Sequence, residues 1–163
     1  MSNLTEEPKL LLPSNPIIKE ATLTSFKKFK GIDKAATENF FGKAGDSIPA
    51  PIGATASVIF GAIYGNVTIK LTSNYVNCKF DHDFWGLGVA GGQSVGFLYT
   101  AYDNWDAFFE NVAGFHIQGI AEAGGILQVN FFLKNATPVG QYNGVMIGVS
   151  AFEGGNSGKW SCS

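Results

Sequence analysis

The sequence contains no arginine, and only 15% of its 163 residues carry a charge. All eleven positive charges are lysines, and the formal net charge is -2. Arginine supplies the planar fork that grips phosphates and guanine edges through two hydrogen bonds. Nucleic-acid-binding proteins show a basic footprint. We therefore expect no nucleic acid among the partners of this chain.

Cysteine and histidine are also scarce. Cys78 and Cys162 lie far apart, and the two histidines are His82 and His116. A disulfide framework needs more cysteines, and a zinc site needs closely spaced cysteines and histidines. Two free thiols and a single bridge to the C-terminal tail both fit the sequence. We expect no metal and no cofactor.

Long apolar runs are missing, so no segment is predicted to cross a membrane as a helix. Residues 1–7 lack the basic and then apolar pattern of a signal peptide. We expect a soluble protein. It is cytoplasmic unless it is secreted, or delivered into a host cell, without a classical signal peptide.

The charges that are present divide the chain. Residues 1–50 hold seven of the eleven lysines, whereas residues 51–163 are apolar and rich in glycine. We interpret the first part as an N-terminal arm, flexible or partly helical, and the second as the folded core. Within the arm, residues 17–30 have a weak helical pattern with Ile18, Phe26 and Phe29 loosely on one side. This segment either docks on the core or stays mobile; a membrane-surface role has little support from so weak an amphipathic pattern.

From residue 53 onward, large side chains alternate with small or polar ones, which is the period of a β-strand. The predicted strands are 58–64, 67–71, 76–80, 85–89, 95–99, 115–119, 127–133 and 145–149. Turn signals between strands include Gly65-Asn66, Ser73-Asn74, Gly91-Gly92 and Gly124-Gly125, and residues 135–138 are a predicted loop.

One helix interrupts the alternation. Asp103 can cap it, and its apolar stripe suits an element that covers one end of a barrel; the stripe consists of Trp105, Phe108, Phe109 and Val112. The fold class is therefore all-β: a closed, antiparallel, eight-stranded β-barrel with one short helix. Closure removes the sticky strand edges of an apolar sheet. Bulky residues expected to point inward, namely Phe60, Phe97, Phe115 and Phe131, favour a filled interior.

The order of motifs from Phe80 onward resembles the virulence-associated proteins, the Vap family, of Rhodococcus. The motifs are Phe80-Asp81-His82-Asp83, Gly86-Leu87-Gly88-Val89, Gly91-Gly92, Gly96-Phe97-Leu98-Tyr99-Thr100, the helix from Asp103, Leu127-Gln128-Val129-Asn130-Phe131-Phe132, Gly144-Val145-Met146-Ile147-Gly148-Val149-Ser150 and Gly154-Gly155-Asn156-Ser157-Gly158-Lys159-Trp160. The resemblance covers about the last half of the chain, and residues 53–79 by pattern only.

The resemblance implies an eight-stranded barrel behind a variable N-terminal region. It also implies a non-enzymatic effector, released by a bacterium, that acts on the endolysosomal compartment of macrophages. The family has no known cofactor or deep pocket. This chain departs from it in the missing secretory signal and in the lysine-bearing arm.

Few residues offer chemistry. Asp81-His82-Asp83 is the densest polar cluster, and we interpret it as a polar turn in which His82 can sense pH. His116 shares a strand face with Gln118 and is read as a surface or satisfied barrel histidine. The sequence contains no catalytic constellation, so no catalytic residue is assigned.

The tryptophans Trp85, Trp105 and Trp160 are candidates for core positions or for contact with a membrane or partner. The leading hypothesis is a Vap-like effector, a monomer, that contacts a host membrane or host protein through its barrel surface. One alternative is a barrel that binds or cyclises a small apolar ligand. Another is cargo or an assembly module of a secretion apparatus, with the arm as its loading signal.

Overall fold

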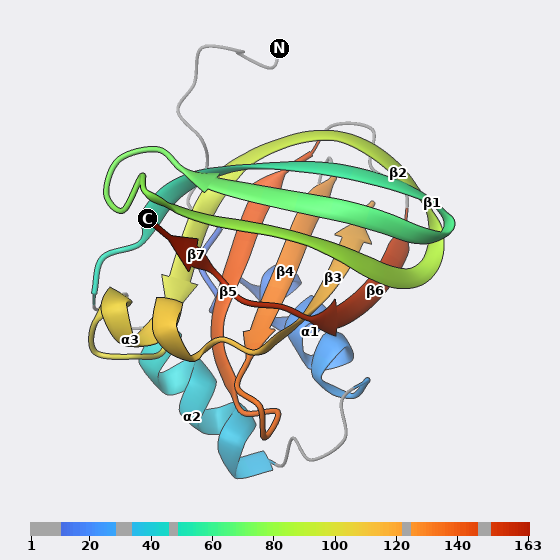
Figure 1. Cartoon of the computed structure of the whole chain (residues 1–163). Helices are drawn as coiled ribbons and strands as arrows, with labels where there is room; N and C mark the ends of the chain where they lie inside the picture. Colours follow the sequence, from blue (N-terminus) through green and yellow to red (C-terminus); the bar gives the residue numbers. More distant parts are fainter. Residues whose placement is uncertain (1–10, 29–33, 46–48, 122–124, 147–150) are drawn as a thin grey trace, which may run out of the picture.

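The computed structural model describes residues 11–28, 34–45, 49–121, 125–146 and 151–163. These residues form three helices and seven strands (Figure 1). The helices are α1 (Pro16–Phe26), α2 (Lys34–Gly45) and α3 (Trp105–Asn111). The strands are β1 (Ile52–Leu71), β2 (Cys78–Thr100), β3 (Gly114–Ile120), β4 (Ile126–Phe132), β5 (Pro138–Val145), β6 (Phe152–Ser157) and β7 (Ser161–Cys162).

All strand pairs are antiparallel, in the order β1-β2-β5-β4-β3-β6. A further pairing of β6 with β2 closes the sheet into a barrel, and β7 pairs with β2 outside this path. The two ends of β1 also meet, because the Thr72 amide donates to the Gly53 carbonyl at 2.9 Å. The predicted closed antiparallel β-barrel is therefore confirmed.

The predicted count of eight strands is wrong, because the long bent strand β1 replaces two predicted strands and the long bent strand β2 replaces three. Neither Gly65-Asn66 nor Gly91-Gly92 is a hairpin turn; both lie inside a continuous strand. At Gly65 a Cβ would lie 2.5 Å from the Ile59 carbonyl oxygen, so only glycine allows β1 to bend there. The first half of β2 pairs with β6 and the second half with β5.

Strands β5 and β6 were not predicted. The last predicted strand, 145–149, meets β5 only at Val145, and residues 147–150 lie outside the described residues. The Ser73-Asn74 turn between β1 and β2 is confirmed.

The short helix covers one end of the barrel, as predicted. Asn104, rather than Asp103, caps α3: its side chain accepts a hydrogen bond from the Ala107 amide at 2.9 Å. The buried side chains of α3 face the core, where the Phe108 ring lies 5.5 Å from that of Phe131.

The barrel interior is filled by apolar side chains, including Phe60, Phe115 and Phe131. Phe97 does not point inward. It pairs with Gly53 and Asn143 on the outer face, while its neighbour Leu98 is buried inside. Cys78 and Cys162 form a disulfide that ties β7 to β2, which settles the choice between free thiols and a bridge.

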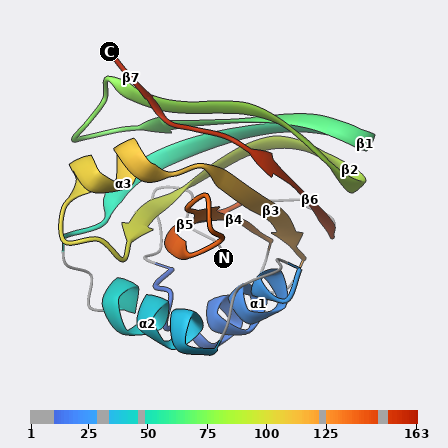
Figure 2. The same ribbon diagram turned by 60° about the horizontal axis from the view of Figure 1, so that its bottom comes forward.

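The N-terminal helices cover the outside of the barrel. Figure 2 shows α1 and α2 in one layer against β3, β4 and β5, opposite the β1–β2 side. The predicted helix is confirmed as α1, which Asn15 caps by accepting from the Ile17 amide at 2.9 Å, and it docks on the barrel. Helix α2 was not predicted, since its adjacent Phe40 and Phe41 give no helical stripe. Among the described residues, no helix is long and apolar enough to span a bilayer.

Candidate functional site

Exposed apolar side chains gather on the outer side of the β1–β2 pair. Trp85 is 56% exposed and Leu87 70% exposed. Tyr64 pairs with Trp85 across the two strands, and their rings meet edge to face at 4.7 Å. We call this group the β1–β2 patch; it consists of Ile59, Ile63, Tyr64, Trp85 and Leu87. Grouped exposed apolar side chains mark contact surfaces more often than scattered single ones do.

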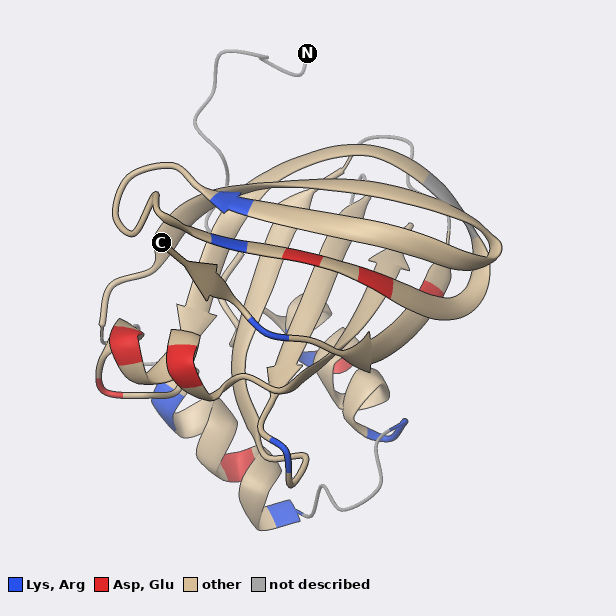
Figure 3. Ribbon diagram, viewed as in Figure 1, with Lys and Arg blue, Asp and Glu red and all other residues tan. Residues whose placement is uncertain are grey.

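A polar border runs beside the β1–β2 patch. The Tyr64 hydroxyl donates to Asp83, and the Asn66 amide donates to Asp81 at 3.0 Å and to Asp83 at 3.1 Å. The hydrogen bonds from Tyr64 and then Asn66 lower the pKa of Asp83, and the same contact raises the pKa of Tyr64. Asp83 therefore keeps its charge in mild acid. Figure 3 shows how few charges otherwise lie on the β1 and β2 ribbons.

The three tryptophans lie in different surroundings. Trp105 and Trp160 are 5% and 7% exposed and pack in the core, where the Trp160 ring lies 5.0 Å from Phe109. Neither offers its ring to a surface partner. Only Trp85 presents a ring to solvent, and its contact with a membrane or partner stays a prediction.

The predicted polar turn at Asp81-His82-Asp83 is wrong, because all three residues lie within β2. Asp81 and Asp83 share the outer face, while His82 points the other way and contacts the Phe80 ring at 4.8 Å. Its Nε2 atom lies 2.8 Å from the Lys159 carbonyl oxygen and 2.9 Å from the Lys159 amide nitrogen. A pH-sensing role for His82 stays a prediction. Among the described residues, no three metal-ligating side chains are grouped closely enough to hold an ion.

A second feature lies under α1, on the outer face of β3, β4 and β5. Register alone places six polar side chains there in two rows of three. All six are buried, and we call them the polar grid; the rows are His116, Asn130, Gln141 and Gln118, Gln128, Asn143. The amides bond to one another at 2.7 to 3.1 Å.

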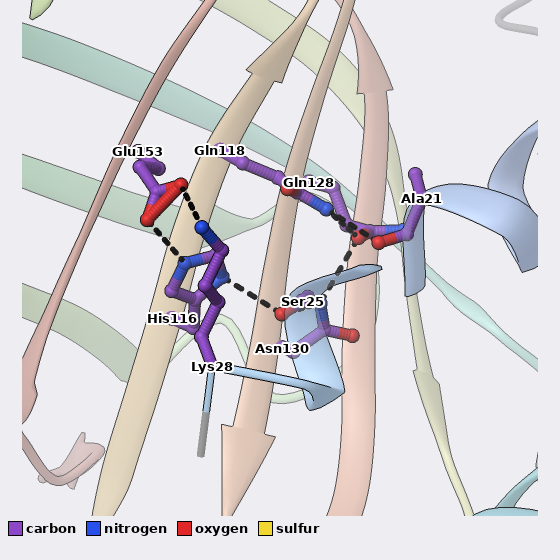
Figure 4. A network of polar contacts seen from close by, with 8 residues as sticks. All are labelled: Ala21, Ser25, Lys28, His116, Gln118, Gln128, Asn130 and Glu153. Carbon is purple, nitrogen blue, oxygen red and sulfur yellow. Dashed lines mark hydrogen bonds and ion pairs between the residues drawn. The ribbon is translucent and has the colours of Figure 1, made fainter. Parts of the chain in front are cut away.

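Helix α1 completes the polar grid with its own polar groups (Figure 4). Thr22 Oγ1 accepts from Gln128 at 3.1 Å and from Gln141 at 2.8 Å. Ser25 Oγ accepts from Asn130 at 3.0 Å and lies 2.7 Å from Nδ1 of His116. The interface between helix and barrel is therefore hydrogen-bonded at its centre.

His116 links α1 to β6. Its Nε2 atom lies 3.7 Å from a Glu153 oxygen, and Lys28, just after α1, pairs with the other Glu153 oxygen at 3.1 Å. Burial lowers the pKa of His116, while Glu153 opposes this shift and Lys28 adds to it. The ring is thus held neutral at neutral pH.

Sequence reasoning placed His116 and Gln118 on one strand face, which the structure confirms. It missed the polar grid, although amide side chains at every second position, at residues 128 and 130 and at residues 141 and 143, indicated a polar strand face. Amides at every second position predict a solvent-facing strand side. Nothing local to the strands indicates that a helix more than 80 residues upstream covers them.

No family model matches the sequence, and comparison with curated proteins finds no match. Two solved structures share the fold. Virulence-associated protein VapB from the intracellular pathogen Rhodococcus equi is similar with a TM-score of 0.58 at 22% identity, over 69% of this chain and 97% of VapB. VapD from the same organism gives 0.58 at 18% identity, over 68% and 96% of the two chains. The predicted likeness to Vap barrels is confirmed at the level of fold.

Proposed function

We propose that this chain is a non-enzymatic, Vap-like effector that contacts a host endolysosomal membrane through its β1–β2 patch. The observation that carries the proposal is the exposure of Trp85 beside Leu87 and Tyr64 on an outer barrel face. Tryptophan and tyrosine suit the boundary between lipid and water, because each combines an apolar ring with a polar atom.

Two further observations support an effector. The apolar filling of the barrel interior leaves little support for the alternative of a barrel that binds or cyclises an apolar ligand. The Cys78–Cys162 disulfide is typical of proteins that work in oxidising surroundings outside the cytosol. Action inside a host and a monomeric state belong to the same proposal. Contact with a host protein in place of a membrane, and cargo of a secretion apparatus with residues 1–50 as its loading signal, are alternatives to it.

Co-sedimentation of the full chain with lipid vesicles tests the membrane contact. The double variant Trp85→Ser/Leu87→Ser removes two exposed side chains without touching the core. We expect it to lose at least about tenfold in vesicle affinity, because burying the two side chains in lipid is worth several kcal/mol. The matched control is Val76→Ser, which removes an exposed apolar side chain from the β1–β2 turn, outside the patch.

The lipid headgroup adds a second test. Asp81 and Asp83 border the patch, so wild-type binding should be at least as strong to neutral vesicles as to anionic ones. The double variant binding as well as Val76→Ser would refute the patch. Failure of the wild-type chain to bind either vesicle at pH 7 and pH 5 would refute the membrane contact and direct the search to host proteins.

A further inference from the structure

The contact between α1 and the barrel is unusual in its chemistry. A permanent helix–sheet interface buries apolar side chains, because these give the largest gain from leaving water. Here α1 contributes Thr22 and Ser25 from its second half, both fully buried, and the sheet contributes the polar grid. Neutral amides exchange their internal partners for water at small net cost. The face beneath α1 is therefore suited to being wet as well as covered.

Among the described residues, the buried apolar clusters that include α1 lie toward its two ends. Ile18 packs with Leu11 and Ile126 near the start, and Phe26 packs with Phe40 and Phe132 near the end. These small clusters keep the helix in place, and the hydrogen bonds of the polar grid between them set the stability of the docked helix. A change in the grid therefore shifts the balance between a docked and an undocked helix.

His116 is the one titratable member of the polar grid, and it is buried beneath α1. Its Nδ1 atom lies 2.7 Å from Ser25 Oγ on α1, and its Nε2 atom lies 3.7 Å from Glu153 on β6. The neutral ring has one nitrogen that accepts a hydrogen bond, whereas the charged ring is a donor at both nitrogens. Protonation therefore removes this acceptor and places a positive charge at the buried contact between α1 and the barrel.

The charged groups that face His116 do not reverse this effect. Glu153 on β6 favours the charged ring, but Lys28 already pairs with Glu153 and opposes a second positive charge. The groups facing the ring from α1 and β4, Ser25 and Asn130, are neutral. We propose that α1 is a removable cover of the polar grid, released when His116 takes up a proton.

The sign of the pH dependence follows from burial. The pKa of His116 is lowered while α1 is docked, and it returns toward about 6.5 when the ring meets water. Well above pH 6.5 the ring is neutral in both states, and docking no longer depends on His116. Below pH 6.5 the undocked state binds the proton first, so docking weakens as the pH falls. At pH 5 the shift toward the undocked state reaches at most about thirty-fold, the limit for a docked ring that stays neutral.

Hydrogen exchange of the full-length chain at pH 7.5 and pH 5.0 tests the cover, with each rate corrected for the intrinsic effect of pH. The amides of residues 17–26 should lose protection in acid by up to about thirty-fold, while the amides of β4 keep theirs. His116→Gln stays neutral and should abolish this response. His82→Gln, which changes the other histidine, should retain it.

A pair of threonines on α1 separates docking from helix formation. Thr22→Val removes the acceptor of Gln128 and Gln141, and should lower the protection of α1 at both pH values. Thr24→Val, at an exposed position of the same helix, should leave docking unchanged. Equal effects of the two variants would overturn the role of the grid.

The proposal also fails if wild-type α1 keeps the same protection at both pH values, or if His116→Gln shows the full acid response. If His116→Gln does not fold, NMR titration of the His116 ring in the wild-type chain tests the same link between protonation and undocking. Loss of α1 protection must coincide with the titration of His116, and a loss centred at an unrelated pH overturns the cover. None of these outcomes depends on vesicle binding.

Discussion

At the scale of single residues, close approach decides where glycine must stand. Some strand glycines leave room for a side chain and others do not. Gly61 has no atom within 4 Å of the position a Cβ would take, whereas a Cβ at Gly144 would overlap Ser94 Oγ and the Tyr142 hydroxyl. Those two oxygens form a buried hydrogen bond of 2.9 Å.

Gly144→Ala should therefore destabilise the fold by about 1–3 kcal/mol, the usual cost of overpacking a dense interior. Gly61→Ala, in the same kind of strand, should change stability by less than about 0.5 kcal/mol. Urea unfolding followed by circular dichroism measures both. Equal stability of the two variants would show that the interior adjusts more readily than the contacts indicate.

Residue identity also limited what could be predicted. Trp85, Trp105 and Trp160 are the same residue type in similar apolar strings, and only the fold separates the exposed ring from the buried two. Phe97 was assigned to the wrong face because both faces of its strand are nearly apolar. Alternation gives two faces without saying which is inside.

At the scale of elements, local signals predicted the elements that carry strong periodicity. Strands β3 and β4 and the helices α1 and α3 were found close to their positions. Strand β5 was missed because its outward residues are amides and its sequence is interrupted by glycine and proline, which read as loop. The bends in β1 and β2 were predicted as turns because Gly65-Asn66 and Gly91-Gly92 are typical turn sequences.

The sequence and the structure assign the N-terminal cap of α3 to different residues, Asp103 and Asn104. Asn104→Ala should destabilise the protein by about 1 kcal/mol, because the Ala107 amide loses its partner. Asp103→Ala, the cap predicted from sequence, should have little effect. Thermal unfolding of the two variants tests this, and a larger loss from Asp103→Ala would restore the original assignment.

At the scale of the whole molecule, three long-range connections make one body of the chain. Pairing of β6 with β2 closes the barrel, the Cys78–Cys162 bridge spans 84 residues of sequence, and α1 lies across β3, β4 and β5. None of these connections has a local signal in the sequence. Barrel closure was therefore only an expectation, and the disulfide was one of two open alternatives. The polar grid was not predicted.

The disulfide should be a major source of stability, since it closes a long loop in the unfolded chain. Replacing both cysteines by serine should lower the free energy of unfolding by about 2–5 kcal/mol. Comparison of the serine variant with the oxidised wild type in urea measures the difference. A variant as stable as the wild type would mean that strand pairing alone fixes the C-terminal tail.

The most direct test of the membrane contact is quenching of tryptophan fluorescence by vesicles whose acyl chains carry bromine. Trp105 and Trp160 are buried in the core and provide an unquenched background, whereas Trp85 is exposed. The proposal predicts that brominated lipid quenches the wild-type chain and that Trp85→Phe loses the quenching. Emission that brominated lipid leaves unchanged would contradict insertion of the β1–β2 patch into the membrane.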